Sequence, residues 1–112
     1  VPRERLVIRG GEVMVSRIEL SSDIIESAKK VGTLLRLRGP ANLQGILDDS
    51  GNFLFTDVNL RFGSGVVHTI HAGADIPRMI LQELAGQSID KIPNYIKDGS
   101  KMFRFHDAIF DS

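Results

Sequence analysis

Apolar and polar residues alternate in the first part of the chain, along the segment RLVIRGGEVMV. Alternation with a period of two is typical of a β-strand that has one buried face. Gly10-Gly11 suits the positive φ angles of a two-residue turn, which would pair Ile8 with Val13 and Leu6 with Val15. The pattern therefore predicts a hairpin with one apolar face. Its other face carries Arg3, Arg5, Arg9, Glu12 and Ser16.

The period changes to that of a helix between residues 22 and 37. Ser22 or Asp23 can cap the start of this helix, and Gly39-Pro40 stops it. Gly32 costs about 1 kcal/mol inside a helix relative to alanine, and we expect it to mark close packing onto a sheet. The apolar stripe of the helix consists of Ile24, Ala28, Val31 and Leu35.

Two more segments have clear periods. ANLQGILDDSGNFLFTDVNL returns to a period of two and predicts a second hairpin around Ser50-Gly51, whereas ADIPRMILQELAG predicts a helix capped by Asp75. Turn signals follow at Pro93-Asn94 and Asp98-Gly99, and Phe103 and Phe105 alternate with polar residues near the end. The order indicates an α+β fold with a mainly antiparallel sheet and helices packed on one face.

Composition narrows the class of protein. The chain has 112 residues, which suits a single domain, and 42% of them are hydrophobic, which suits a packed core. Fourteen basic and 14 acidic side chains cancel, so a whole-surface attraction to nucleic acid or a membrane is not implied. The lack of cysteine excludes a thiolate site and fits a cytoplasmic location. The opening VPRERL has no initiator methionine, and we expect a fragment of a longer protein.

The second hairpin carries a row of polar side chains. A symmetric turn at Ser50-Gly51 places Gln44 opposite Asp57 and Asn42 opposite Asn59 on one face. On the other face it places Leu43 opposite Val58 and Leu47 opposite Leu54. The first face then offers one carboxylate and several amide oxygens, the hard donors that magnesium prefers. On periodicity alone, we favour another interpretation over a metal site: these polar residues form the solvated side of a half-covered sheet.

Two features beside this face suit phosphate. Arg61 has a planar fork of donors that matches phosphate oxygens. The backbone amides from Gly63 to Gly65 would bind an anion if they open a helix. A phosphate bridged by a metal would satisfy both the carboxylate of Asp57 and the guanidinium of Arg61.

The segment NLQGILDDSGNFLFTDVNLRFGSGVVHTIHAGADIPRMILQEL resembles the C-terminal part of ATP-grasp enzymes. The likeness is closest to the large chain of carbamoyl-phosphate synthase and related carboxylate-amine ligases. In those enzymes an Asn-x-Gln strand pairs with a strand that ends in Glu-x-Asn-Pro-Arg, and a glycine-rich stretch and a helix follow. We expect residues 1–112 to form one domain. The likeness covers residues 1–87, and residues 88–112 form a C-terminal extension. This chain departs from the pattern at Asp57, where the family has glutamate, and at Leu60, where it has proline.

The resemblance implies that ATP phosphorylates a carboxylate and that an amine attacks the acyl-phosphate. It implies that the partners are a carboxylate substrate, an amine substrate and the N-terminal part of the same enzyme, without which these residues are inactive. A degenerate module kept for interaction or dimerisation is the alternative. The implied cofactors are ATP and Mg²⁺ or Mn²⁺. The implied metal ligands are Gln44, Asp57 and Asn59, the catalytic residue is Arg61, and the nucleotide-binding residues are Asn42, Gly63 and Gly65.

Two weaker patterns have competing interpretations. His68 and His71 are spaced for a shared metal, but packing or surface roles are commoner for two histidines without a third ligand. The row Arg3, Arg5 and Arg9 could hold an anionic substrate, although a solvated strand face is the simpler interpretation. We also expect an exposed apolar surface, through which two copies could form a homodimer.

Overall fold

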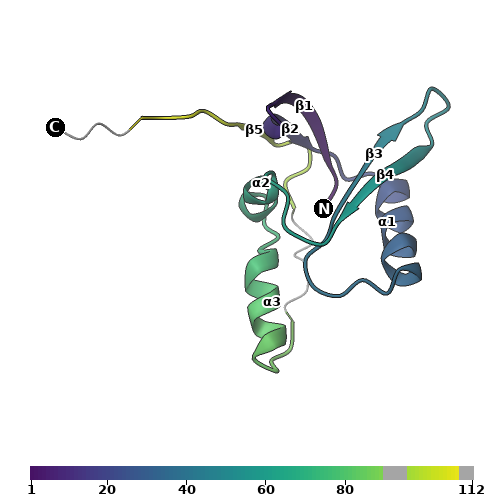
Figure 1. Cartoon of the computed structure of the whole chain (residues 1–112), viewed down its shortest axis with the longest axis vertical. Helices are drawn as coiled ribbons and strands as arrows, with labels where there is room; N and C mark the ends of the chain where they lie inside the picture. The colour runs from purple at the N-terminus through teal and green to yellow at the C-terminus, as the bar shows by residue number, and fades with distance from the viewer. Residues whose placement is uncertain (90–95, 109–112) are drawn as a thin grey trace.

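The computed structural model describes residues 1–89 and 96–108. The described residues form two antiparallel sheets and three helices, which confirms the α+β class, although the strands divide between two sheets (Figure 1). The predicted turn at Pro93-Asn94 lies outside the described residues. The elements are β1 (Arg3–Arg9), β2 (Glu12–Ile18), α1 (Ser22–Leu34), β3 (Asn42–Leu47), β4 (Phe53–Asn59), α2 (Val66–His71), α3 (Ile76–Leu84) and β5 (Lys101–Phe103).

The first sheet has the strand order β1-β2-β5. Ile8 pairs with Val13 as predicted, but Val7 rather than Leu6 lies opposite Val15, because the register shifts on both sides of Val7. The irregularity changes which residues of β2 point inward, since one displaced residue reverses the alternation. Val13, Ser16 and Ile18 are accordingly the buried residues of β2.

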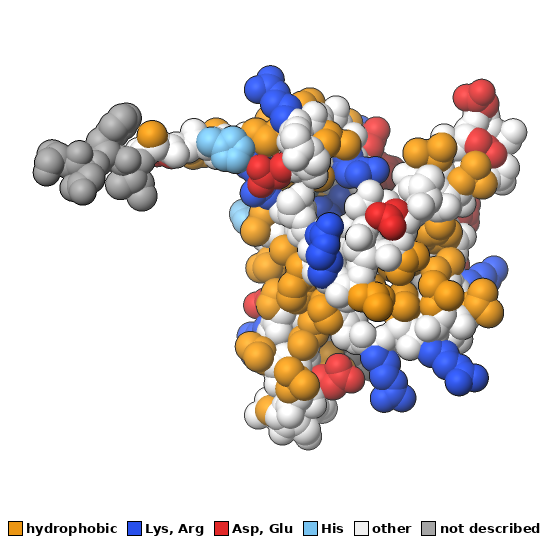
Figure 2. Space-filling model, in the orientation of Figure 1, with side chains coloured by type: hydrophobic (Ala, Val, Ile, Leu, Met, Phe, Trp, Pro, Cys, Tyr) orange, Lys and Arg blue, Asp and Glu red, His pale blue; other side chains and the backbone are white. Residues whose placement is uncertain are grey.

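α2 lies against this sheet and completes a small core. His68 and Thr69 are buried on α2, and Ala72 and Ala74 are buried just after it. Outside this core, large apolar side chains remain exposed, for example Leu84 of α3, which confirms the expected apolar surface (Figure 2). Among the described residues, no helix combines the length and apolarity that a membrane span requires.

The second sheet is the hairpin β3–β4. The pairs Asn42–Asn59, Leu43–Val58 and Gln44–Asp57 follow the predicted register. Beyond Gln44 the register shifts by one residue, so Leu47 lies opposite Phe53 and the predicted pair Leu47–Leu54 is wrong. The turn is centred on Ser50 alone: Asp48 Oδ1 accepts from the amides of Ser50 and Asn52, 2.9 and 2.8 Å away. The pairs next to the turn and the polar pairs differ in register by one residue, and a bulge at Thr56 of β4 takes up this difference.

The helices start and end for local reasons. Ser21 caps α1 through its Oγ, which accepts from the Ile24 amide, so the cap lies one residue before Ser22. α1 ends at Leu34, earlier than predicted, because Arg36 turns the chain with a φ of +50° and the Leu37 amide donates to Gly32 O at 2.9 Å. In α3 the predicted cap is confirmed, since Asp75 Oδ1 accepts from the Arg78 amide at 3.1 Å.

Two glycines allow a matched test of close packing. A Cβ on Gly45 would meet Leu54 O and would lie 2.5 Å from Phe53 Cε1, whereas a Cβ on Gly32 would meet nothing within 4 Å. The expectation that Gly32 packs closely onto a sheet is therefore wrong, and the close contacts are instead those of Gly45 in β3 with Phe53 and Leu54 of its paired strand β4. Gly45→Ala should lower the free energy of unfolding by about 1–3 kcal/mol, while Gly32→Ala should raise it by about 0.5–1 kcal/mol. Urea denaturation of both variants measures the two values, and equal effects would contradict this account of the bulge.

Candidate functional site

Four polar side chains of β3 and β4 share one face of the hairpin. Gln44 lies directly opposite Asp57, and Asn42 lies directly opposite Asn59. Residues two apart on a strand point to the same side, so the two pairs belong to one patch. Within the patch, Asn59 Nδ2 donates to Asp57 Oδ2 at 2.6 Å. Asp57 is exposed, whereas Asn42, Gln44 and Asn59 are half-buried. The geometry predicted from the sequence is confirmed at these four positions.

The loop Gly63–Gly65 closes one end of the patch. A Cβ on Gly63 would lie 2.9 Å from both Cγ and Oδ1 of Asn42, so the loop packs directly on that side chain. A Cβ on Gly65 would overlap the Arg3 guanidinium. The loop leads into α2, as expected, and the Val66 amide donates back to Gly63 O at 3.0 Å. A side chain at either position would therefore displace the side chain of Asn42 or of Arg3.

Arg61 lies at the rim of the patch, two residues after Asn59. Its Nη1 donates to the carbonyl of its neighbour Phe62 at 3.0 Å, and the side chain is exposed. Within the described residues it forms no ion pair with Asp57. The structure therefore brings together the amides and the carboxylate, while the guanidinium of Arg61 stays free of that carboxylate.

β1 contributes two arginines to the site, although it belongs to the other sheet. Arg5 Nη1 donates to Gln44 Oε1 at 3.1 Å, and Arg3 packs over Gly65. Arg9, the third arginine of the row, lies beside the exposed turn. The interpretation of the row as a solvated strand face therefore fits Arg9 and also Arg5, which is exposed although it contacts Gln44, but it fails for the half-buried Arg3. The sequence could not show which strand face would meet Gln44.

Arg104, which the sequence did not single out, fastens the glycine loop to β2. Its Nη2 donates to Ser64 O at 2.6 Å and its Nε donates to Val13 O at 3.1 Å, while Nη1 pairs with Glu12 Oε1 at 2.8 Å. Ser64 Oγ also accepts from the Val13 amide at 3.3 Å. The loop is thus held from both its side chain and its backbone. No sequence signal joins Arg104 to Ser64, because 40 residues separate them.

His68 has a packing role, which is the interpretation that the sequence favoured over a metal site. Its Nδ1 lies 2.8 Å from Ser16 Oγ and its Nε2 lies 3.2 Å from Ser100 Oγ, so both ring nitrogens are bonded within the core. Burial, with smaller contributions from the charges of Arg3 and His71, lowers the pKa of His68 below its ordinary value of 6.5. Over residues 1–89 and 96–108, no cluster of three or more His, Cys, Asp or Glu side chains could hold a metal ion.

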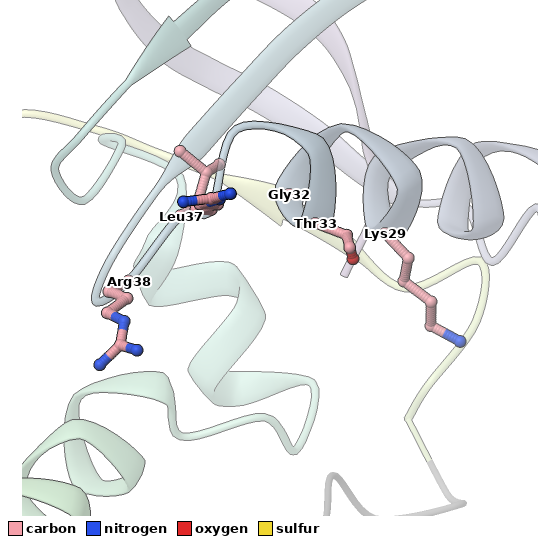
Figure 3. A pocket seen from close by; sticks show the side chains of 6 residues that line it. Lys29, Gly32, Thr33, Leu37 and Arg38 are labelled. Atoms are coloured by element: carbon pink, nitrogen blue, oxygen red, sulfur yellow. The ribbon is translucent and has the colours of Figure 1, made fainter.

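An open cavity of about 460 Å³ lies away from this patch, at the C-terminal end of α1 (Figure 3). Lys29 and Arg38 point in different directions there, and Lys29 is already paired with Glu26 at 2.8 Å. The cavity therefore offers no convergent set of charges. Its lining residues are Lys29, Gly32, Thr33, Arg36, Leu37 and Arg38.

One comparison with known proteins gives a match. The model of a family described as "ATP-grasp in the biosynthetic pathway with Ter operon" matches residues 1–103. A search of curated proteins found no significant match. The matched range includes both sheets and every predicted site residue, and it ends one residue before Arg104.

Replacement of Arg104 should loosen the glycine loop. Arg104→Gln removes the ion pair to Glu12 and at least one of the hydrogen bonds that hold Ser64 and Val13. We expect backbone amides from Ser64 to Val67 to exchange with solvent about 10-fold faster or more, since a hydrogen bond to a charged group contributes about 1.5–3 kcal/mol. Lys101→Gln, an exposed residue of β5 just before Arg104, is the control. Unchanged exchange in Arg104→Gln would show that Ser64 alone holds the loop.

The buried imidazole predicts a pH dependence of stability. Because the pKa of His68 is lowered in the folded protein, the unfolded chain binds the proton more readily. The stabilisation from neutral His68 is therefore fully present above about pH 6.5 and is lost as the pH falls below that value. The difference in free energy of unfolding between the wild type and His68→Asn should shrink from pH 8 to pH 5, as measured by urea denaturation. A difference that is constant with pH would contradict this role.

Proposed function

Because the chain belongs to the ATP-grasp family described as "ATP-grasp in the biosynthetic pathway with Ter operon" and is thus an ATP-dependent ligase-type module, we propose that the β3–β4 patch binds magnesium-nucleotide phosphates. The register that places Gln44 opposite Asp57 and Asn42 opposite Asn59 is the observation that carries this proposal. ATP-grasp enzymes use ATP and Mg²⁺, and the patch offers only hard oxygen donors to such an ion.

The donor set fits a metal that arrives with its nucleotide. Asp57 is the single carboxylate of the patch, and one carboxylate with amide oxygens is a weak site for a free ion. Phosphate oxygens would supply the missing negative charge. Gln44, Asp57 and Asn59 would hold Mg²⁺ or Mn²⁺, and the ion would supply charge neutralisation on the phosphates. The side chain of Asp57 is one methylene shorter than that of glutamate, so a metal ion bound directly to it would lie closer to β4.

The remaining site residues suit the phosphates themselves. Gly63 and Gly65 let the loop backbone approach, and Asn42 packs beneath it. Arg61 stays free of Asp57 and is exposed at the rim, where its guanidinium can neutralise charge on a phosphoryl group in transfer. None of these residues forms a covalent bond to substrate; their contribution is orientation and electrostatic stabilisation.

We assign the chemistry to carboxylate activation, on the likeness of Asn42-x-Gln44 and Asp57-x-Asn59-x-Arg61 to the carbamoyl-phosphate synthase large chain. A substrate carboxylate oxygen attacks the γ-phosphorus of ATP, the bond from that phosphorus to the β-phosphate oxygen breaks, and ADP leaves. The nitrogen of an amine then attacks the acyl carbon, loses a proton, and expels inorganic phosphate. In the enzymes that the chain resembles, the adenine pocket and phosphate-binding lysines come from an upstream segment, so these 112 residues should bind nucleotide weakly and show no ligase turnover.

Manganese in place of magnesium gives a direct test of the patch. In the ¹⁵N-labelled chain with excess ATP, Mn²⁺ should broaden the side-chain amide signals of Gln44 and Asn59 first. Asp57→Asn should weaken this effect about 10-fold or more, since loss of even an outer-shell partner typically costs 10- to 100-fold in metal affinity. Asp49→Asn makes the same change in the exposed turn of the hairpin and should have no effect.

Two results would overturn the assignment. One is broadening centred on Asp48 and Asp49 in the turn. The other is broadening at Gln44 that Asp57→Asn leaves unchanged. Complete absence of nucleotide-dependent broadening would favour the alternative, a degenerate module that serves interaction or dimerisation.

A further inference from the structure

Arg3 is held in an unusual position for an arginine. It lies at the start of β1 and is half-buried, and its guanidinium occupies the space that a side chain on Gly65 would need. A Cβ there would lie 2.7 Å from Arg3 Cζ and 3.3 Å from Nη2. The chain therefore keeps position 65 without a side chain and places a guanidinium directly over the loop of the candidate site.

Nothing in the described part of the chain neutralises this guanidinium. Arg3 Nε is buried and has no hydrogen-bond partner, and Arg3 forms no ion pair among those residues. Arg17 Nε is likewise buried without a hydrogen-bond partner, but the charge of Arg17 is neutralised by Glu4, 2.6 Å from its Nη2. Arg104, directly after β5, is paired with Glu12 at 2.8 Å. A buried donor without an acceptor is costly, so the unpaired state of Arg3 calls for a ligand.

The charges around Arg3 increase this cost. Burial and, after it, the charge of Arg5 lower the pKa of Arg3. Arg5 lies two residues along the same strand, and its Nη1 donates to the neutral Gln44 Oε1. Arg3 and Arg5 thus share one side of β1, and no carboxylate of the described residues pairs with either. An anion between them would supply the missing acceptor and would relieve the repulsion.

We propose that Arg3 and Arg5 form an oxyanion-binding subsite that takes a carboxylate group of the substrate without the help of a metal. A guanidinium offers two parallel donors that match the two oxygens of a carboxylate. The contact of Arg5 with Gln44 places this subsite beside the metal patch, and the lack of a side chain on Gly65 leaves the space that the Arg3 guanidinium occupies. The inference rests on the proposed function for the identity of its ligand, but the binding itself requires neither nucleotide nor metal.

A titration with succinate in the presence of EDTA tests the subsite. The Nε–Hε signal of Arg3 in the ¹⁵N-labelled chain should shift progressively as succinate fills the unpaired donor. Arg3→Gln should weaken succinate binding about 10- to 100-fold, since a hydrogen bond to a charged group contributes about that factor to an affinity. Arg3→Lys should recover part of the affinity, because it restores charge but not the fork. Arg9→Gln removes the same charge from the same strand and should leave the affinity unchanged.

The controls separate this inference from the proposed function. Asp57→Asn should leave succinate binding intact, even where it abolishes the effect of Mn²⁺ with ATP. Inorganic phosphate is titrated in parallel: binding of phosphate alone would overturn the carboxylate assignment. An Arg3 signal that succinate does not move in the wild type would overturn the subsite, whatever the folding of the variants. Equal weakening by Arg9→Gln would show a general charge effect and would also overturn it.

Discussion

The candidate site depends on the register of β3 against β4. A shift of one residue in this pairing would turn Gln44 and Asp57 to opposite faces of the hairpin. Such a shift does occur, but only after Gln44, on the side of the turn. Gly45 stands at the point of change, where the Phe53 ring and Leu54 O leave no space for a Cβ. The bulge therefore absorbs the odd length of the turn before it reaches the polar face.

The site forms at the seam between the two sheets. β1 of the first sheet reaches Gln44 of the second through Arg5, and the loop after β4 is fastened back to β2 through Ser64. The buried core is small and lies between β2 and α2. Polar contacts join the two sheets across the seam, in addition to the packing of α1 against β4. Arg104, directly after β5 and beyond the range that the family model matches, adds to these contacts.

Sequence reasoning succeeded where the cause was local. The alternation of Asn42, Gln44, Asp57 and Asn59 fixed their shared face, and Asp75 was identified as a cap because capping requires only neighbouring residues. It failed where the cause was tertiary. Gly32 and Gly45 look alike in a sequence, and only the packing of Phe53 distinguishes them.

The same distinction applies to the arginines. Alternation placed Arg3, Arg5 and Arg9 on one strand face, but it could not show that a second sheet and a glycine loop would meet two of them. Likewise, the turn around Ser50 was predicted, whereas its odd length depends on how the Asp48 side chain bonds to the backbone.

Charge illustrates why the fold must be known before a ligand is inferred. Over the whole chain 14 basic and 14 acidic side chains cancel, which argues against a general attraction to polyanions. The topology nevertheless separates the charges locally. Glu4 and Glu12 pair with Arg17 and Arg104, outside the patch, and Asp57 is the carboxylate that remains within it. Among the described residues, Arg3, Arg5 and Arg61 have no acidic partner, so positive charges remain uncompensated beside the glycine loop and the patch although the chain is neutral overall. These are the charges to which we assign a nucleotide phosphate and a substrate carboxylate.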